Sequence, residues 1–305
     1  MTGTRPFRFA LQAMGLADRD EIVATARLAE ALGYEELWSY DHLGAVDPFV
    51  PLVVAAEVTT TLRVGPLVLN NELHHPGLLA RTAATVDRLT GGRLVLGLGT
   101  GYAQAEHDAL DLELRPPGRR VDRFGESLEV LRALLDTGTV DHDGEHHHVH
   151  VAELGVRPAQ ARVPFLVGGH GRRVVALAGR HADIFQLTGL THGEGGRPEP
   201  GGFAPEAVAE RVRWLADAAG ERDADIERSL LVQATEVGPH TDAGALAERF
   251  GRPREELEAT PFVLIGSVEQ VVDELERRRR DLGVSHVVVR NAEGFAPVVA
   301  ALAGR

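Results

Sequence analysis

The sequence predicts an α/β fold, a (β/α)8 TIM barrel. Two observations predict it: eight apolar stretches of strand length alternate with amphipathic stretches of helical length, and no long linker interrupts the series. Several strands, such as 64–69 and 287–289, are apolar without a break, as expected for strands that are buried on both faces. A doubly wound open sheet has the same alternation and is the competing architecture, but eight units in series favour a closed barrel.

The predicted elements follow one another in a regular order. The strands cover residues 7–13, 36–40, 62–70, 93–99, 164–168, 183–187, 229–236 and 285–290. The helices lie near 18–32, 49–60, 76–90, 119–136, 171–181, 205–220, 267–282 and 294–303. Asp18 with Glu21 and Ser267 with Gln270 fit capping boxes at two helix starts, and Gly33 fits a helix end.

A bare barrel needs about 250 residues, so residues 1–305, taken as one domain, leave room for insertions. We expect three, after strands four, six and seven. Residues 137–163 contain a hairpin-like Asp143-Gly144 turn, residues 189–204 hold six glycines, and residues 238–262 form the third insertion. The glycine-rich segment is either a lid over the site or a surface loop, because long loops at strand ends commonly carry function.

The composition excludes several kinds of chemistry. All 32 basic residues are arginines and no cysteine is present, which excludes lysine Schiff bases, thiolate metal sites and catalytic thiols. A net charge of −13 argues against nucleic-acid and anionic-membrane partners. No apolar stretch reaches about 18 residues, and the first nine residues are too polar for a signal peptide. We therefore expect a cytoplasmic protein.

Barrel enzymes carry their active sites at the carboxyl ends of the strands, so the residues that follow each strand are the candidates. Asp41 and His42 follow the second strand, and a histidine beside a carboxylate can exchange a proton near neutral pH. A helix-capping pair on a polar loop is the alternative. His74 and His75 precede a proline that begins a helix, and we interpret them as a structural turn.

A glycine-rich run links the fifth strand to the next helix. It consists of Gly168, Gly169, His170 and Gly171, followed by two arginines. Glycines let the backbone approach an anion, and the free N–H groups and dipole of a helix start attract it. We interpret the run as a phosphate site; a tight turn that only requires glycine is the alternative.

A cluster of histidines lies in the first insertion, at positions 142, 146, 147, 148 and 150. In an extended segment His146, His148 and His150 would share a face, as three imidazole ligands of a metal would. No carboxylate–histidine pattern recurs on the barrel strands, so we interpret the segment as a solvated hairpin and expect no metal.

The motifs taken together resemble a known family. They are WSYDH at 38–42, VGPLVLNN at 64–71, DRLTGGR at 87–93 followed by LGLGTGY at 96–102, and the segments 164–171 and 266–271. In this order they resemble the bacterial luciferase-like superfamily of flavin-type barrel enzymes, and more narrowly its branch that uses the deazaflavin coenzyme F420. The resemblance covers nearly the whole chain.

The resemblance implies a set of site residues. Asp41 and His42 match an acid–histidine pair near the cofactor ring, with the histidine as proton donor or acceptor. Leu67 and Val68 match a non-proline cis peptide that supports the ring. The remaining cofactor-binding positions are Asn70, Thr100, Gly101 and Tyr102, with Gly168, Gly169, His170 and Gly171 around the phosphate.

Two departures bear on the substrate. The family's sugar-phosphate dehydrogenases have a glutamate where this chain has Tyr102, and they hold the phosphate partly with lysines, which are absent here. The resemblance then implies an F420-dependent oxidoreductase that acts on an unphosphorylated, partly hydrophobic small molecule. An FMN-dependent monooxygenase and a catalytically silent flavin-binding barrel are the alternatives, and a homodimer is expected from the family.

Overall fold

The computed structural model describes residues 5–192, 198–238 and 243–305, and it places nine parallel strands in a barrel. They are β1 (Arg8–Gln12), β2 (Glu36–Ser39), β3 (Arg63–Pro66), β4 (Leu69–Asn70), β5 (Leu96–Gly99), β8 (Phe165–Gly168), β9 (Ile184–Thr188), β12 (Glu227–Leu231) and β15 (Val284–Val289). The sheet order is β3-β2-β1-β15-β12-β9-β8-β5-β4. The barrel prediction is confirmed, and the open-sheet alternative is wrong.

The barrel closes through its third strand, which is in two pieces. β3 pairs with β2, and β4 pairs with β5, so the same stretch of chain reaches both edges of the sheet. A parallel bridge between Val64 and Leu94 adds to this closure. Between the two pieces the Leu67–Val68 peptide is cis, as the resemblance implied.

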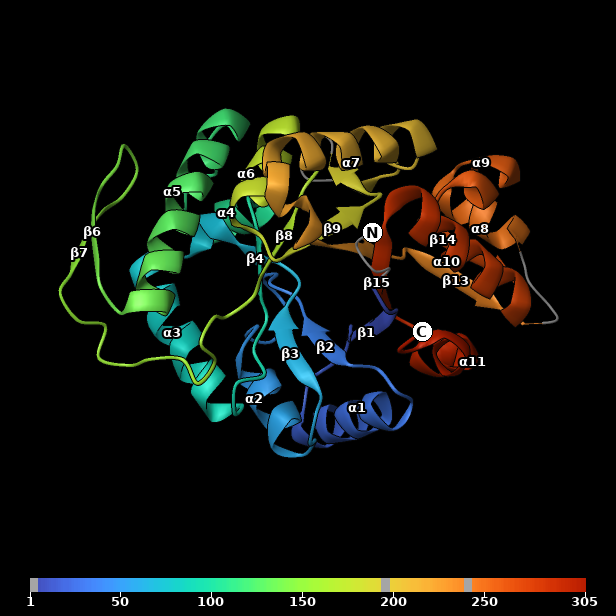
Figure 1. Cartoon of the computed structure of the whole chain (residues 1–305), viewed down its shortest axis with the longest axis horizontal. Helices are drawn as coiled ribbons and strands as arrows, with labels where there is room; N and C mark the ends of the chain where they lie inside the picture. The colour runs from blue at the N-terminus through green and yellow to red at the C-terminus, as the bar shows by residue number, and fades with distance from the viewer. Residues whose placement is uncertain (1–4, 193–197, 239–242) are drawn as a thin grey trace.

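Eight helices surround the strands (Figure 1). They are α1 (Arg19–Ala31), α2 (Val50–Glu57), α3 (Pro76–Leu89), α5 (Pro117–Thr137), α6 (Arg172–His181), α7 (Pro205–Ala219), α10 (Val268–Leu282) and α11 (Ala292–Leu302). Apolar side chains fill the layer between helices and strands, and a second cluster around Trp38, which is fully buried, fills the barrel interior. The strands are therefore apolar on both faces, which explains their unbroken apolar runs.

The three insertions lie where the sequence predicts them. The first is an antiparallel hairpin of β6 (Val140–Asp143) and β7 (His148–Val151), which lies beside α5 at the left of Figure 1. The second pairs β10 (Thr191–His192) with β11 (Pro198–Glu199). The third contains α8 (Ala243–Phe250) and α9 (Arg254–Ala259) at the opposite side of the view. Residues 193–197 and 239–242 of the last two lie outside the described residues.

The predicted seventh strand, 229–236, is wrong in its extent. The chain leaves the barrel after Leu231, and β13 (Ala234–Val237) pairs instead with β14 (Val263–Gly266) in a separate two-stranded sheet. Only Val232 and Gln233 separate the two strands, too few residues to mark a break in the sequence pattern. The short helix α4 (Gln104–Ala109) was not predicted either, since six residues are too few to show helical periodicity.

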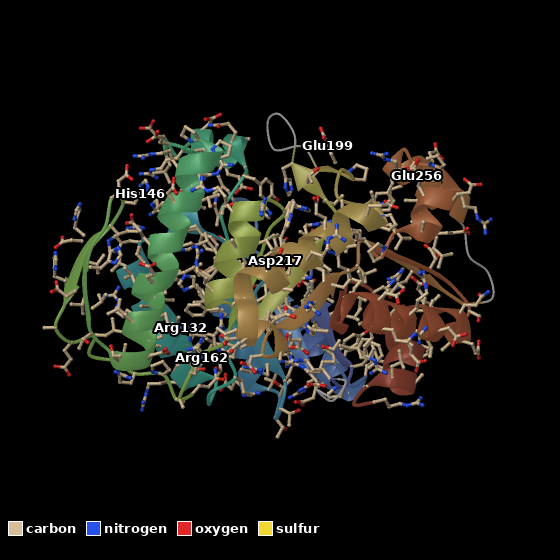
Figure 2. All side chains as sticks on the ribbon, turned by 45° about the horizontal axis from the view of Figure 1, so that its top comes forward. Arg132, His146, Arg162, Glu199, Asp217 and Glu256 are labelled. Atoms are coloured by element: carbon tan, nitrogen blue, oxygen red, sulfur yellow. The ribbon has the colours of Figure 1, made fainter. Side chains whose placement is uncertain are left out.

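Ion pairs fasten the strands to the helices at the amino end of the barrel. Asp183, directly before β9, accepts hydrogen bonds from Arg132 of α5 and from Arg162. The same carboxylate accepts the backbone N–H of Phe165 at the start of β8. Figure 2 shows the two arginines close together. These ion pairs join the starts of β8 and β9 to the helix α5.

Candidate active site

A cavity of about 480 Å³ opens at the carboxyl ends of the barrel strands. Its volume is in the range of small-molecule and cofactor sites. All the predicted site residues line it: Asp41, His42, Leu67, Val68, Asn70, Thr100, Gly101, Tyr102, Gly168, Gly169, His170 and Gly171. The strand-end argument therefore brought together residues that are up to 130 positions apart in the chain.

Asp41 connects the ends of the second and third strands. Its Oδ2 accepts the backbone N–H of Asn70 at 2.9 Å and lies 2.9 Å from Nε2 of His74. The predicted pairing of Asp41 with His42 is therefore wrong, because this carboxylate is already bound to His74. His74 does more than form a turn, whereas His75 caps α3 by accepting the N–H of Gly77, as a structural residue does.

The carboxylate beside His42 belongs to Glu106 of α4. Nδ1 of His42 lies 2.6 Å from Oε1 of Glu106, and Nε2 of His42 lies 3.0 Å from the hydroxyl of Tyr102. With the Nδ1 proton directed at the carboxylate, Nε2 is left to accept the tyrosine hydroxyl. Glu106, His42 and Tyr102 thus form a continuous hydrogen-bonded chain along the wall of the cavity.

Tyr102 is covered by the second insertion. Its ring stacks on the imidazole of His192 in β10, with ring centroids 3.4 Å apart. Burial, and then the nearby negative charge of Glu106, raises the pKa of Tyr102 to about 12. The tyrosine therefore keeps its proton at neutral pH and can serve as a donor. Burial and the proximity of His42 lower the pKa of His192, so the imidazole that stacks on the ring of Tyr102 is favoured in its neutral form.

The turn after β5 requires glycine at one position. Gly101 has φ +77°, and a Cβ added to it would lie 1.9 Å from Oδ1 of Asn70. The amide of Asn70 is itself fixed, since its Oδ1 accepts the N–H of Glu72 and its Nδ2 lies 3.1 Å from Nε2 of His107. The absent side chain therefore lets Asn70 lie against the turn and face the cavity.

The amino terminus of α6 opens into the same cavity. Gly171 is its N-cap residue, with φ −73° and ψ 143°, and no side chain caps the helix. A Cβ at this position would meet nothing within 4 Å. The protein's own packing therefore does not require glycine here, and its presence leaves the first N–H groups of the helix accessible to an anion.

His170 has a structural role within this turn. Its Nε2 lies 2.6 Å from the carbonyl oxygen of Leu190, and its Nδ1 accepts a hydrogen bond from Arg211 at 2.8 Å. Burial first, and Arg211 second, lowers the pKa of His170 to about 4. The imidazole is thus neutral and engaged by protein groups, so only the backbone of His170 is available to a phosphate.

Two arginines can supply positive charge near the start of α6. Arg172, in its first turn, is exposed. Arg120 of α5 lines the cavity, and its Nε is buried without a hydrogen-bond partner. The two helices meet at this point, since Arg173 bonds to Asp122 and to the carbonyl of Gly118 in α5. Open N–H groups and two arginines fit the phosphate and acidic tail of a nucleotide-like cofactor.

The histidines of the first insertion lie away from this cavity. His148 and His150 are exposed on the hairpin and pair with Asp143 and Asp141. His147 is buried, 3.0 Å from the hydroxyl of Ser127. Figure 2 places the neighbouring His146 at the far side of α5. Among the described residues, no group of three or more potential ligands is placed to hold a metal ion.

Sequence reasoning missed Glu106, His192, Arg120 and Arg290, which also line the cavity. Glu106 lies four residues after Tyr102, so a short helix after the Gly-Thr-Gly turn would have indicated it. Arg290 directly follows the eighth strand, the position that strand-end reasoning examines. His192 and Arg120 come from segments whose paths the sequence does not indicate.

The comparisons with known proteins define the family. The model of the luciferase-like monooxygenase family matches residues 5–235, about three quarters of the chain, and the chain belongs to this family. The solved coenzyme F420 dependent tetrahydromethanopterin reductase from Methanopyrus kandleri has a TM-score of 0.78, with 20% identity and 98% of each chain covered. At this identity, the likeness shows the shared fold alone.

Two curated relatives extend the comparison. A 5,10-methylenetetrahydromethanopterin reductase of Archaeoglobus fulgidus is 29% identical over 163 residues, 53% of this chain and 47% of the relative. The 4-hydroxyprotoasukamycin monooxygenase of Streptomyces nodosus subsp. asukaensis is 31% identical over 212 residues, 67% of this chain and 54% of the relative. The chain spans about half the length of these relatives. In the described part of the chain, no helix has the length and apolar character needed to cross a membrane.

Proposed function

We propose that the protein is an oxidoreductase that transfers a hydride between coenzyme F420 and a small organic molecule. The observation that carries the proposal is the chain of Glu106, His42 and Tyr102 in a cavity that also contains an open anion cradle at the start of α6. Hydride transfer to or from a carbonyl requires a coupled proton, and this chain can hold and move one. A reductase among the curated relatives supports the same chemistry.

The proposed cofactor site uses residues at three strand ends, together with one arginine of α5 and one of α6. The N–H groups at the start of α6, Arg120 and Arg172 would hold the phosphate and the acidic tail of F420. Leu67, Val68 and the turn at Gly101 would support the ring. When bound, the deazaflavin supplies a carbon centre that gives or accepts a hydride.

The protein side chains handle the proton. In the direction of reduction His42 would begin protonated on both ring nitrogens. Tyr102, whose pKa is raised to about 12, would give its hydroxyl proton to the substrate oxygen and take the Nε2 proton of His42, which is left neutral. Glu106 would stabilise the protonated imidazole through Nδ1, 2.6 Å away. In the reverse reaction the proton moves from substrate to Tyr102 and on to His42. Asp41 would act by holding the ends of two strands together rather than by meeting the substrate.

An FMN-dependent monooxygenase is the second candidate. It is favoured by the monooxygenase that is 31% identical to this chain. The two candidate cofactors need different numbers of cationic groups, because FMN ends in one phosphate whereas F420 continues beyond its phosphate into a carboxylate-rich tail. An exposed arginine beside the cradle, Arg172, suits the longer anion. A silent flavin-binding barrel would not need the Tyr102–His42–Glu106 chain.

Titration of the purified protein with F420 and with FMN, followed by cofactor fluorescence, tests the cofactor. We expect F420 to bind with micromolar or better affinity and FMN to bind at least tenfold more weakly. Micromolar binding of FMN with no response to F420 would establish the second candidate instead. The homodimer and the cytoplasmic location stay predictions.

A further inference from the structure

One cation in the cavity is not used by the proposed cofactor contacts or by the proton chain. Arg290 follows β15 at the carboxyl end of the barrel and lines the cavity. The residue is exposed although it lies in the barrel mouth. A guanidinium on the wall of a ligand cavity is placed to meet an anionic group of the ligand.

Two glutamines hold Arg290 in place without neutralising it. Nε donates to Oε1 of Gln12 at 2.9 Å, and Nη1 donates to Oε1 of Gln233 at 3.2 Å. The amide nitrogens of these glutamines are engaged by the carbonyl oxygens of Leu67 and Leu231, so each amide must turn its oxygen towards the arginine. The guanidinium is thus oriented, and three of its five N–H donors are left for a ligand.

The charged groups near Arg290 do not neutralise it. Partial burial lowers the pKa of Arg290, and the positive charge of Arg249 in α8 lowers it further. The two acidic residues that line the cavity, Asp41 and Glu106, are bound to His74 and His42. Within the part of the chain that the structure describes, the positive charge here has no negative partner.

Resting on the proposed function, we propose that Arg290 is the anchor for the carboxylate of the substrate, which is therefore a small organic acid with an apolar body. Three free donors on one planar group match the two oxygens of a carboxylate. Leu67 and Leu231, whose carbonyl oxygens bind the two glutamines, also line the cavity and would provide apolar surface for the rest of the molecule. A phosphate monoester is less well matched, because the start of α11 beside Arg290 is already capped by the side chain of its N-cap residue Asn291, which accepts the N–H of Gly294.

Hexanoate and hexanamide are suitable probes, because they share one shape and differ in charge. Binding to the wild-type protein, with and without bound cofactor, is measured by calorimetry. We expect hexanoate to bind at least tenfold more tightly than hexanamide. The variant Arg290→Gln should lose this preference while it binds the cofactor within about twofold of wild type. The matched variant Arg120→Gln, on the other side of the same cavity, should keep the preference and bind the cofactor more weakly.

The outcomes separate this proposal from the proposed function. Equal binding of acid and amide, no binding of hexanoate, or an unchanged preference in Arg290→Gln would overturn the carboxylate anchor. Loss of cofactor affinity in Arg290→Gln with the preference intact would assign the arginine to the cofactor ring instead. Failure of F420 and FMN to bind would refute the proposed function, and the cofactor-free titration would still decide whether Arg290 binds a carboxylate.

Discussion

Substitution of Gly171 by aspartate should stabilise the fold and weaken cofactor binding at the same time. Nothing lies within 4 Å of a Cβ at this position, and the backbone there, φ −73° and ψ 143°, is the extended conformation of an N-cap residue. An aspartate can therefore enter without strain and accept the N–H groups of the first turn of α6. Such a cap with its favourable dipole interaction is expected to contribute about 0.5 kcal/mol relative to glycine.

Cofactor binding should change in the opposite direction. The carboxylate of Gly171→Asp would occupy the donors that a phosphate needs, and it would repel that phosphate. Two unit charges about 5 Å apart, at an effective dielectric constant of about 20, repel by about 3 kcal/mol. We therefore expect affinity for the cofactor to fall by roughly 100-fold or more.

Fluorescence titration and urea unfolding of the same preparations measure the two effects. Gly171→Asn is the matched control, because it caps the helix without the charge. We expect it to be as stable as the aspartate variant within about 0.5 kcal/mol and to bind the cofactor more tightly than that variant. Unchanged cofactor affinity in Gly171→Asp would refute the assignment of the α6 start as the phosphate site.

Three further predictions follow from named contacts. Tyr102→Phe keeps the stacked ring but removes the hydroxyl that bonds His42, so kcat should fall about 100-fold in stopped-flow turnover while the cofactor Kd stays within about twofold. Gly101→Ala should weaken cofactor binding in the same titration, because its Cβ would displace the amide of Asn70; equal affinity would contradict the turn's role. Burial alone would raise the pKa of Glu36, but His286 and Arg8 lower it to about 2. The ionised carboxylate therefore stabilises the fold at pH values above its unfolded pKa. This stabilisation is lost as the pH falls from about 4.5 to 2. A pKa shift of this size corresponds to about 3 kcal/mol. In urea unfolding, Glu36→Gln should lower the free energy of unfolding by that order at pH 7, and this free energy should no longer fall between pH 4.5 and 2 as it does in the wild type. A variant whose stability depends on pH as the wild type's does would contradict the prediction.

The order of elements was predictable because each one is encoded locally. Unbroken apolar strands and amphipathic helices report burial directly, and the barrel then places every strand end at one mouth. For this reason Asp41, Asn70 and Gly168, from three different strands, could be assigned to one cavity before any coordinates were known.

The contacts within the cavity were less predictable, because they join residues that are distant in the chain and carry no periodic signal. The bond between His42 and Glu106 spans 64 residues and depends on a six-residue helix. Asp41, adjacent to His42 in sequence, turns instead to His74, 33 residues away. Likewise, the lowered pKa of His170 results first from burial and then from Arg211 of α7, a residue that no local motif indicates. Adjacency in the sequence therefore did not predict which carboxylate is hydrogen-bonded to which histidine.

The central claim is that the protein moves a hydride, with its proton carried by Tyr102 and His42, and does not activate oxygen. Reduced F420 that is deuterated at its hydride-donating carbon can be bound to the protein under nitrogen and mixed with small-molecule extracts enriched in organic acids. The account predicts reoxidation of the cofactor without oxygen, with the deuterium recovered in a product. Reoxidation that requires oxygen, with an oxygen atom incorporated into the product, would contradict it.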